Sequence, residues 1–168
     1  MSGFSGRRGF VLATAVAVGL ALSACARNPT DADSAMNGAY GATSGPGSIG
    51  EFTSSVGDRV FFDTDSTELN AQGQATLDKQ AAWLSRYPRY TFTIEGHADE
   101  RGTREYNFAL GSRRAESTKE YLIAKGIAAS RMRTISFGKE RPVAVCNDIS
   151  CWSQNRRAVT VLAGGAGS

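Results

Sequence analysis

The stretch YTFTIEGHADERGTREYNFALGSRRAESTKEYLIAK, residues 90–125, contains the signals for a strand, a loop and a helix in direct succession. Apolar and polar side chains alternate over residues 90–95, which predicts a β-strand. The polar residues 96–102 that follow predict a loop. Thr103 is a favourable N-cap, because its hydroxyl can accept a hydrogen bond from a free backbone N–H of the first helical turn. We expect this helix to run through Lys125.

Similar patterns on both sides complete the predicted element order. Helical spacing of apolar residues predicts a helix over residues 68–85, and residues 139–155 are expected to form a long loop. Three β-favouring runs predict further strands at 58–62, 133–137 and 157–162. The order β-α-β-α-β-β predicts an α+β fold, a two-layer sandwich with the helices on one face of a four-stranded mixed sheet.

The N-terminus has the layout of a secretory signal peptide, which we assign to residues 1–24. Arg7 and Arg8 precede an uncharged run of 13 residues, 10–22, which is too short to span a membrane. A plain charged segment explains the two arginines, although they also faintly resemble a twin-arginine export signal. The segment LSAC, residues 22–25, resembles the lipobox of bacterial lipoproteins.

The lipobox resemblance implies that Cys25 is lipidated and becomes the N-terminal residue after cleavage. Ala26 follows it, whereas an aspartate would have suggested retention in the inner membrane, so outer-membrane lipid is the expected partner. Residues 25–51 are rich in glycine and poor in large apolar side chains, which predicts a flexible linker behind the lipidated end. The folded domain is expected at 52–163, followed by a disordered tail at 164–168.

Charge and cysteine content limit the possible partners. The chain has 19 Lys and Arg residues against 16 Asp and Glu, and its net charge of +3 falls to about +1 (17 against 16) when Arg7 and Arg8 leave with the signal peptide. This excludes a strongly basic nucleic-acid-binding protein. If Cys25 carries lipid, Cys146 and Cys151 remain and are expected to form a disulfide in an oxidising compartment, with two free thiols as the alternative.

The loop and helix of the opening stretch contain a candidate binding site. Asp99 lies in the loop, and Asn107, Leu110 and Arg114 fall on one helix face at positions i, i+3 and i+7. An acid, a helix N-terminus and a guanidinium around one pocket suit a zwitterion. Asp99 would bind its ammonium group, and Arg114 its carboxylate through two parallel N–H bonds. A free amino acid and the far end of meso-diaminopimelate both fit this description.

Over about residues 58–162 the chain resembles the C-terminal OmpA-like domain family. The resemblance rests on GHADERGTREYNFALGSRRAESTKEYLIAKG, with VFFDTDS upstream and SFGKERP and SQNRRAV downstream. The lipobox and the linker match the layout of the lipoprotein members of that family. The resemblance implies the OmpA-like α+β fold and non-covalent binding of peptidoglycan stem peptides through meso-diaminopimelate. It implies a binding protein without a cofactor or a metal, and not an enzyme.

The functional residues of the family transfer to this chain position by position. Asp99 and Arg114 match the main diaminopimelate-binding pair. Thr103 and Asn107 match supporting polar contacts, and Leu110 matches a packing contact. Phe62, Asp63 and Asp65 match the loop that borders the pocket. His97 and Arg101 are two further positions of the motif. The chain departs from the family at Thr64, where a second aromatic residue is frequent, and at Arg104, where proline is common.

The resemblance also implies membership of the Tol system, with TolB and in second place TolA as protein partners, and a role in outer-membrane integrity and cell division. Two alternatives remain open from the residues alone. The first is a lipoprotein that acts only through protein partners. The second is a wall-modifying enzyme in which His97 and Asp99 hold zinc, but a catalytic zinc needs three protein ligands and the chain has a single histidine.

Overall fold

The computed structural model describes residues 45–163. The predicted signal peptide, Cys25, the linker up to residue 44 and the predicted tail lie outside the described residues. The elements in chain order are α2 (Ile49–Glu51), the π-helical turn η1 (Phe52–Gly57), β1 (Arg59–Phe61), α3 (Ala71–Arg86), β2 (Phe92–His97), α4 (Arg104–Ala124), the 3₁₀ turn η2 (Ala129–Arg131), β3 (Met132–Gly138), α5 (Ile149–Asn155) and β4 (Arg157–Leu162).

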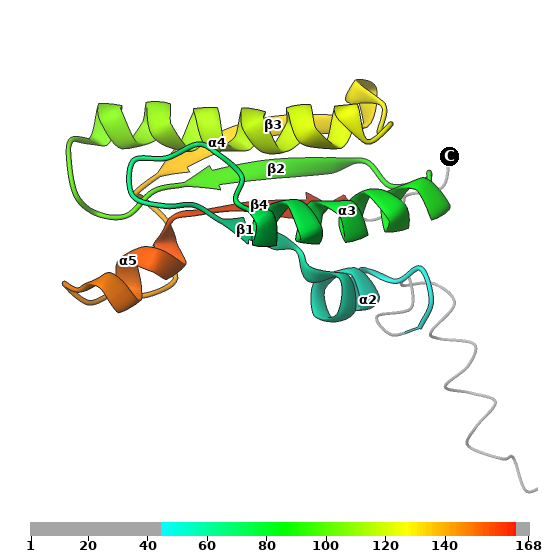
Figure 1. Ribbon diagram of the computed structural model, residues 1–168, viewed down its shortest axis with the longest axis horizontal. Coiled ribbons are helices and arrows are strands. Elements are labelled where there is room, and N and C mark those ends of the chain that lie inside the picture. Colours follow the sequence, from blue (N-terminus) through cyan, green and yellow to red (C-terminus); the bar gives the residue numbers. More distant parts are fainter. Residues whose placement is uncertain (1–44, 164–168) are drawn as a thin grey trace, which may run out of the picture.

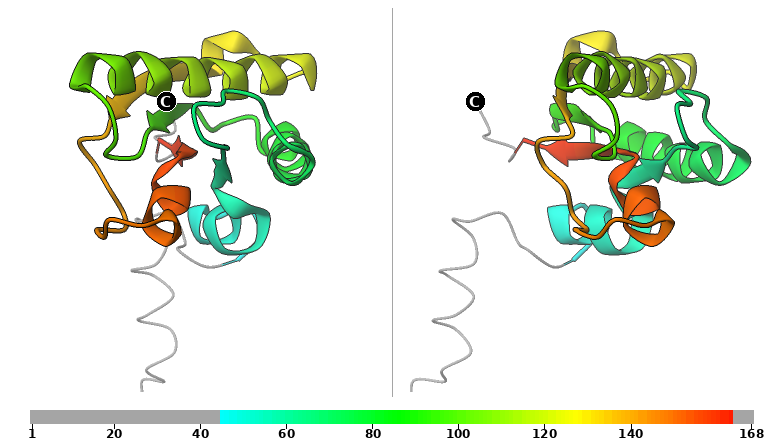
Figure 2. Two further views of the ribbon diagram at one scale, coloured as in Figure 1. Left: turned by 60° about the vertical axis from the view of Figure 1, so that its left-hand side comes forward. Right: turned by 90° about the vertical axis from the view of Figure 1, so that its left-hand side faces the viewer.

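The strands form one mixed sheet in the order β1-β4-β2-β3, which confirms the predicted fold class. The central strand β2 pairs in parallel with β3 and antiparallel with β4, while β1 pairs antiparallel with β4. Helices α3 and α4 cover the same face of this sheet, as Figures 1 and 2 show. The core lies between the two layers, and every second strand residue points into it: Val60, Phe92, Ile94, Ala158 and Leu162 are all buried.

Two glycines allow α4 to lie unusually close to β2. Gly96 lies in β2 and Gly111 in α4, and a Cβ atom on Gly96 would overlap the carbonyl group of Gly111. On the next strand, Ser136 lies close to the same helix, because its hydroxyl donates to the carbonyl oxygen of Phe108 at 2.7 Å. This close approach fixes the distance between the first turns of α4 and the loop that follows β2.

The folded unit begins before Phe52, the residue at which the sequence led us to expect it. The hydroxyl of Tyr90 donates to the Gly47 carbonyl oxygen at 2.7 Å, and Nε1 of Trp83 donates to a carboxylate oxygen of Glu51 at 2.7 Å. The Phe52 ring is fully buried, with its centroid 4.9 Å from that of Trp83. Residues 45–51 are ordered by these distant partners, which a composition rich in glycine does not reveal.

The expected loop at 139–155 contains the helix α5. Its N-cap is Asp148, whose side chain accepts from the Ser150 backbone N–H at 2.8 Å. Cys146 and Cys151 are joined by a disulfide with their Cα atoms 5.6 Å apart. A helix of seven residues is too short for a clear helical period, so the sequence pattern alone did not predict it.

Candidate ligand-binding site

The candidate site lies at the end of the sheet where β2 finishes and α4 begins. Four segments meet there: residues 62–66 after β1, the loop 98–103 after β2, the first half of α4 and the residue before β4. Thr103 is the N-cap of α4, as the sequence predicted, because its hydroxyl accepts from the Tyr106 backbone N–H at 3.1 Å. The first helical turn is thereby fixed directly behind the loop that carries Asp99.

Asp99 is a nearly buried carboxylate that two arginines contact. Arg101 donates from Nε to Oδ1 at 3.1 Å and from Nη2 to Oδ2 at 2.7 Å. Arg156 donates from Nη1 to Oδ2 at 3.3 Å. Burial alone would raise the pKa of Asp99, but the hydrogen bonds from Arg101, with a further one from Arg156, outweigh it and hold the pKa below its usual value. The group is therefore ionised at neutral pH.

Arg114 is fully buried, and its guanidinium joins two walls of the site. Nε donates to the Ser66 carbonyl oxygen at 2.9 Å and Nη2 to that of Asp63 at 3.0 Å, both in the segment after β1. Nη1 donates to the His97 carbonyl oxygen at 2.9 Å, at the end of β2. Burial, followed by repulsion from Arg156, lowers the pKa of Arg114 to about 10, so it remains charged at neutral pH.

These contacts give Arg114 a structural role in addition to the ligand-binding role expected from the sequence. A guanidinium has five N–H donors, and three of those of Arg114 already bind backbone carbonyl oxygens. Its other two N–H donors have no hydrogen-bond acceptor among the described residues. The guanidinium also lies 5.2 Å from the centroid of the Phe62 ring, which forms the apolar floor beneath it. Arg114 therefore holds the segment after β1 against the end of β2, and it also contributes a positive charge to the site.

Arg156 is the residue of this site that the sequence reasoning missed. Arg156 and its neighbour Arg157 are both buried, with 6% and 4% exposure. Arg156 donates from Nε to the Phe62 carbonyl oxygen at 3.0 Å, in addition to its contact with Asp99. The available signal was its place in SQNRRAV, one of the segments that carry the family resemblance, directly before a strand.

The buried charges of the site do not balance. Arg114 and Arg156 contribute two buried cations, and Asp99 is the buried carboxylate that faces them. Asp63 and Asp65 lie at the rim with exposed side chains. Because an unpaired buried charge is costly, the site favours a ligand that brings a carboxylate of its own. The zwitterionic ligand expected from the sequence stays a prediction.

The other predicted positions divide into two groups. Asn107 and Leu110 are buried on the face of α4 that also carries Arg114, and Asn107 donates from Nδ2 to the Arg101 carbonyl oxygen at 2.6 Å. Asp65 has a positive φ of 53° and accepts a long hydrogen bond of 3.4 Å from the Tyr106 hydroxyl. These residues surround the site, at its base or at its rim.

The imidazole of His97 belongs to the other face of the sheet. Side chains alternate along a strand, and Gly96 faces α4, so the His97 ring points away from α4. It lies against the Phe137 ring, with the centroids 5.5 Å apart. Only the backbone carbonyl of His97 contacts Arg114, so the ring is not brought to the site.

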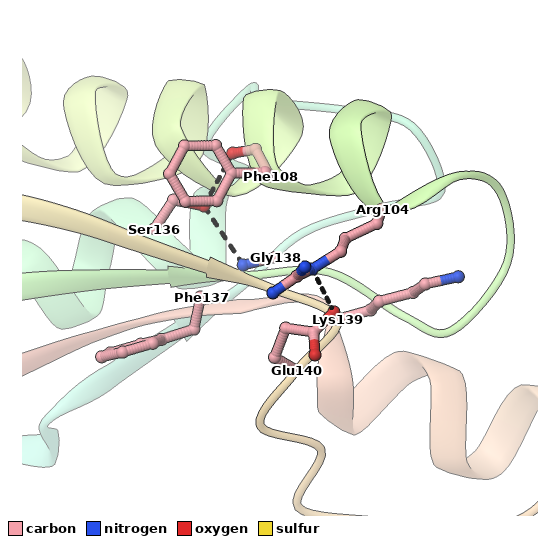
Figure 3. Close-up of a pocket in the computed structure, with 7 residues that line it drawn as sticks. All are labelled: Arg104, Phe108, Ser136, Phe137, Gly138, Lys139 and Glu140. Atoms are coloured by element: carbon pink, nitrogen blue, oxygen red, sulfur yellow. Dashed lines mark hydrogen bonds and ion pairs between the residues drawn. The ribbon is translucent and has the colours of Figure 1, made fainter.

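Two shallow cavities lie near these residues. One, of about 280 Å³, is lined by Phe62, Asp63 and Arg156 together with Phe61, Asn70, Ser153 and Gln154. The other, of about 270 Å³, lies between the start of α4 and the end of β3, where Arg104 pairs with Glu140 at 3.1 Å (Figure 3). None of the predicted site residues lines this second cavity.

Within residues 45–163, no group of three or more His, Cys, Asp or Glu side chains is placed to hold a metal ion. No helix among these residues is both long and apolar enough to cross a bilayer.

A mixed sheet covered on one face by two helices, with a carboxylate shared between arginines at one end, defines the class of OmpA-like α+β domains. Residues 61–156 match the OmpA family. The chain is 64% identical to the peptidoglycan-associated lipoprotein of Rhizobium meliloti (strain 1021) over 157 residues, which cover 92% of this chain and 88% of that protein. It is 40% identical to the peptidoglycan-associated lipoprotein of Haemophilus influenzae over 139 residues, which cover 83% and 88%.

Solved structures give the same result. The crystal structure of the peptidoglycan-associated lipoprotein from Burkholderia pseudomallei matches with a TM-score of 0.63 and 42% identity, over 66% of this chain and 96% of that chain. The C-terminal domain of Helicobacter pylori MotB, at 20% identity and a TM-score of 0.60, over 65% and 86%, shares the fold. The chain belongs to the OmpA family, and its close relatives are peptidoglycan-associated lipoproteins.

Proposed function

We propose that this protein is an outer-membrane lipoprotein that binds peptidoglycan non-covalently and ties the outer membrane to the cell wall. The names of the relatives support the association with peptidoglycan. The ligand group we assign is the free end of meso-diaminopimelate in the stem peptide. The observation that carries this assignment is the buried cluster of Asp99, Arg114 and Arg156, which offers one acid and an excess of guanidinium donors to a small zwitterion.

The geometry of the site supports the following role for each residue. The ammonium group of the ligand binds the carboxylate of Asp99. Its carboxylate binds the remaining donors of Arg114 and Arg156, whose burial strengthens each charge-assisted hydrogen bond. Asn107 and Thr103 fix the loop and the helix start around the ligand, while Leu110 and Phe62 supply apolar contact. Asp63 and Asp65 border the opening.

The rest of the chain serves to hold this site within reach of the wall. Cys25 carries the lipid that anchors the protein on the periplasmic face of the outer membrane, and the residues before Gly45 connect it to the domain. The domain acts without catalysis. TolB, and in second place TolA, are its protein partners in the Tol–Pal system, through which it supports membrane integrity and constriction during cell division.

Sedimentation with purified sacculi tests the binding function. We expect the mature protein to sediment with sacculi and to be released by free meso-diaminopimelate. Asp99→Asn should lose about 2–5 kcal/mol of binding free energy, because a desolvated ammonium group is then left without its counter-charge. Asp78→Asn, which changes an exposed acid on α3, is the matched control and should bind like the wild type.

Two results would contradict the proposal. Wild-type protein that stays in the supernatant with bare sacculi would favour a lipoprotein acting only through protein partners. Undiminished binding by a folded Asp99→Asn variant would remove the assignment of the ammonium site. Release of soluble wall fragments from the sacculi would show an enzymatic activity instead.

A further inference from the structure

The carboxylate of Asp99 is already occupied by a cation from its own loop. The fork of the Arg101 guanidinium contacts both oxygens, at 3.1 Å and 2.7 Å. An incoming ammonium group needs the same oxygens. The two partners differ in exposure, because 41% of the Arg101 side chain is exposed against 10% of that of Asp99. The cation can therefore leave towards solvent while the acid stays in place.

The backbone around Arg101 is held independently of its side chain. Asn107 binds the Arg101 carbonyl oxygen at 2.6 Å, and Nζ of Lys139 donates to the carbonyl oxygens of Gly102 at 2.7 Å and Glu100 at 3.2 Å. A rotation of the Arg101 side chain breaks none of these bonds. The loop can thus keep its shape while its guanidinium moves.

Trp152 holds the guanidinium on its other side. The Arg101 guanidinium lies 4.2 Å from the centroid of the Trp152 ring, a cation–π contact. The Trp152 indole N–H in turn donates to the carboxylate of Glu100, and its neighbour Cys151 is in the disulfide. Arg101 therefore lies between a carboxylate and an indole that are both fixed by other contacts.

We propose that Arg101 is a built-in competitor for the ammonium group of the ligand and thereby sets the specificity of the site. This inference rests on the proposed function and deepens it. A ligand that has only an ammonium group replaces one ion pair with another, because its contact with Asp99 is offset by the loss of the contact between Arg101 and Asp99. A zwitterion gains in addition the contact of its carboxylate with the buried arginines, so it can displace Arg101 where a simple amine cannot.

The test compares variants by calorimetry with a soluble muropeptide that contains meso-diaminopimelate. Arg101→Ala should bind the muropeptide roughly five- to tenfold more tightly than the wild type, because no ion pair has to be broken first. Trp152→Leu should change affinity in the same direction by a smaller factor. Arg104→Ala is the matched control: it removes an equal charge three residues later, from a side chain 73% exposed that pairs with Glu140. Its affinity should equal that of the wild type.

A second probe tests the specificity directly. n-Butylammonium carries the ammonium group without a carboxylate. It should shift the amide NMR signals of residues 98–103 in Arg101→Ala at concentrations that leave the wild type unchanged. The same spectra show whether each variant is folded.

The outcomes separate this inference from the function on which it rests. If Arg101→Ala binds the muropeptide as the wild type does or more weakly, or gains no response to n-butylammonium, Arg101 is not a competitor. Loss of muropeptide binding in Asp99→Asn shows in that case that the site itself is correctly assigned. If the wild type binds no muropeptide at all, the proposed function fails, and the comparison with n-butylammonium alone decides the role of Arg101.

Discussion

Nε of Arg156 donates to the carbonyl oxygen of Phe62 at 3.0 Å, across a separation of 94 residues in the sequence. The same guanidinium contacts Asp99 from its Nη1 atom at 3.3 Å. One side chain thus joins the segment after β1, the loop after β2 and the start of β4. The site can form only when β1 and β4, the first and last strands in the sequence, have paired in the sheet. An intact site therefore indicates that the whole domain is folded.

Replacement of Arg114 tests whether this residue supports the structure as well as the ligand. Arg114→Met should lower the free energy of unfolding by roughly 3–5 kcal/mol, because three backbone carbonyl oxygens lose their donor and Asp99 loses a nearby cation. The measurement is urea denaturation. Arg113→Met is the control, since Arg113 is the exposed neighbour on the same helix and should change stability by less than about 0.5 kcal/mol. Equal stability of the two variants would show that Arg114 has no structural role.

The space around Gly96 and Gly73 predicts opposite effects on stability when each is replaced by alanine. Gly96→Ala should destabilise the fold severely, because its Cβ would overlap the Gly111 carbonyl group and both backbones are fixed by packing. Gly73→Ala lies in α3, where the nearest atom to an added Cβ is 3.4 Å away, an ordinary contact. This substitution should stabilise the protein by about 0.5–1 kcal/mol through helix propensity. Thermal unfolding of both variants decides, and a Gly96→Ala protein with wild-type stability would contradict the close approach.

His97 gives a prediction for the dependence on pH. Burial first, and then repulsion from Arg157 and Arg141, lowers the pKa of His97 to about 4. Glu95 faces the ring as well, with Oε2 3.7 Å from Nε2, and opposes the shift. At pH values between 4 and 6.5, His97 is protonated in the unfolded chain and neutral in the folded protein. With respect to His97, the free energy of unfolding is therefore at its full value above pH 6.5 and decreases as the pH falls towards 4.

NMR titration of the His97 ring protons checks this directly. Their chemical shifts should stay constant from pH 8 to about pH 5 and change only below, whereas a histidine with an ordinary pKa would titrate near 6.5. The His97→Phe variant should show a weaker loss of stability over the acidic range, because it has no group to protonate there. A midpoint close to 6.5 in the folded protein would refute the buried, neutral state.

The segment around α5 has two independent restraints that can be removed one at a time. Reduction of the disulfide opens a short loop and should lower the free energy of unfolding by about 2 kcal/mol. Asn155 restrains the same segment, because Oδ1 accepts from the backbone of Val143 at 2.9 Å and Ala144 at 3.2 Å, and Nδ2 donates to the Ala144 carbonyl oxygen at 2.8 Å. We expect reduction to speed amide exchange in residues 146–152 and to leave α4 unchanged.

Asn155→Ala should speed exchange over residues 143–145 instead, with the disulfide intact. Ser153→Ala, on the same short helix, is the control, since its hydroxyl donates to the Ser150 carbonyl oxygen within that helix. If reduction alone speeds exchange as far as Val143, the amide of Asn155 is not an independent restraint.

The local sequence pattern predicted those parts of the fold that depend on neighbours in the chain. The alternation over residues 90–95 and the cap at Thr103 predicted β2 and the start of α4 closely. The helical spacing of Asn107, Leu110 and Arg114 correctly placed all three on one buried face. These signals have periods of two and 3.6 residues, so they can be read without knowing the tertiary structure.

The parts that were missed depend on partners far away in the sequence. Gly47 is bound by Tyr90, 43 residues later, and no local pattern announces such a contact. Arg156 resembles a surface charge until β1 and β4 pair and bring Phe62 beside it. The use of Arg114 for three backbone carbonyls could not be foreseen either, because it requires the path of the segment after β1.

In the anchored lipoprotein proposed above, the contacts of Gly47 and Glu51 would determine where a pull on the N-terminus reaches the domain. They attach the N-terminal side of the chain next to Tyr90, ahead of β2, whereas the candidate site begins where β2 ends (Figure 1). A pull between an anchored N-terminus and a held ligand would run lengthwise along the central strand. The ladders to β3 and β4 would then be loaded in shear, with many bonds resisting together instead of opening one by one.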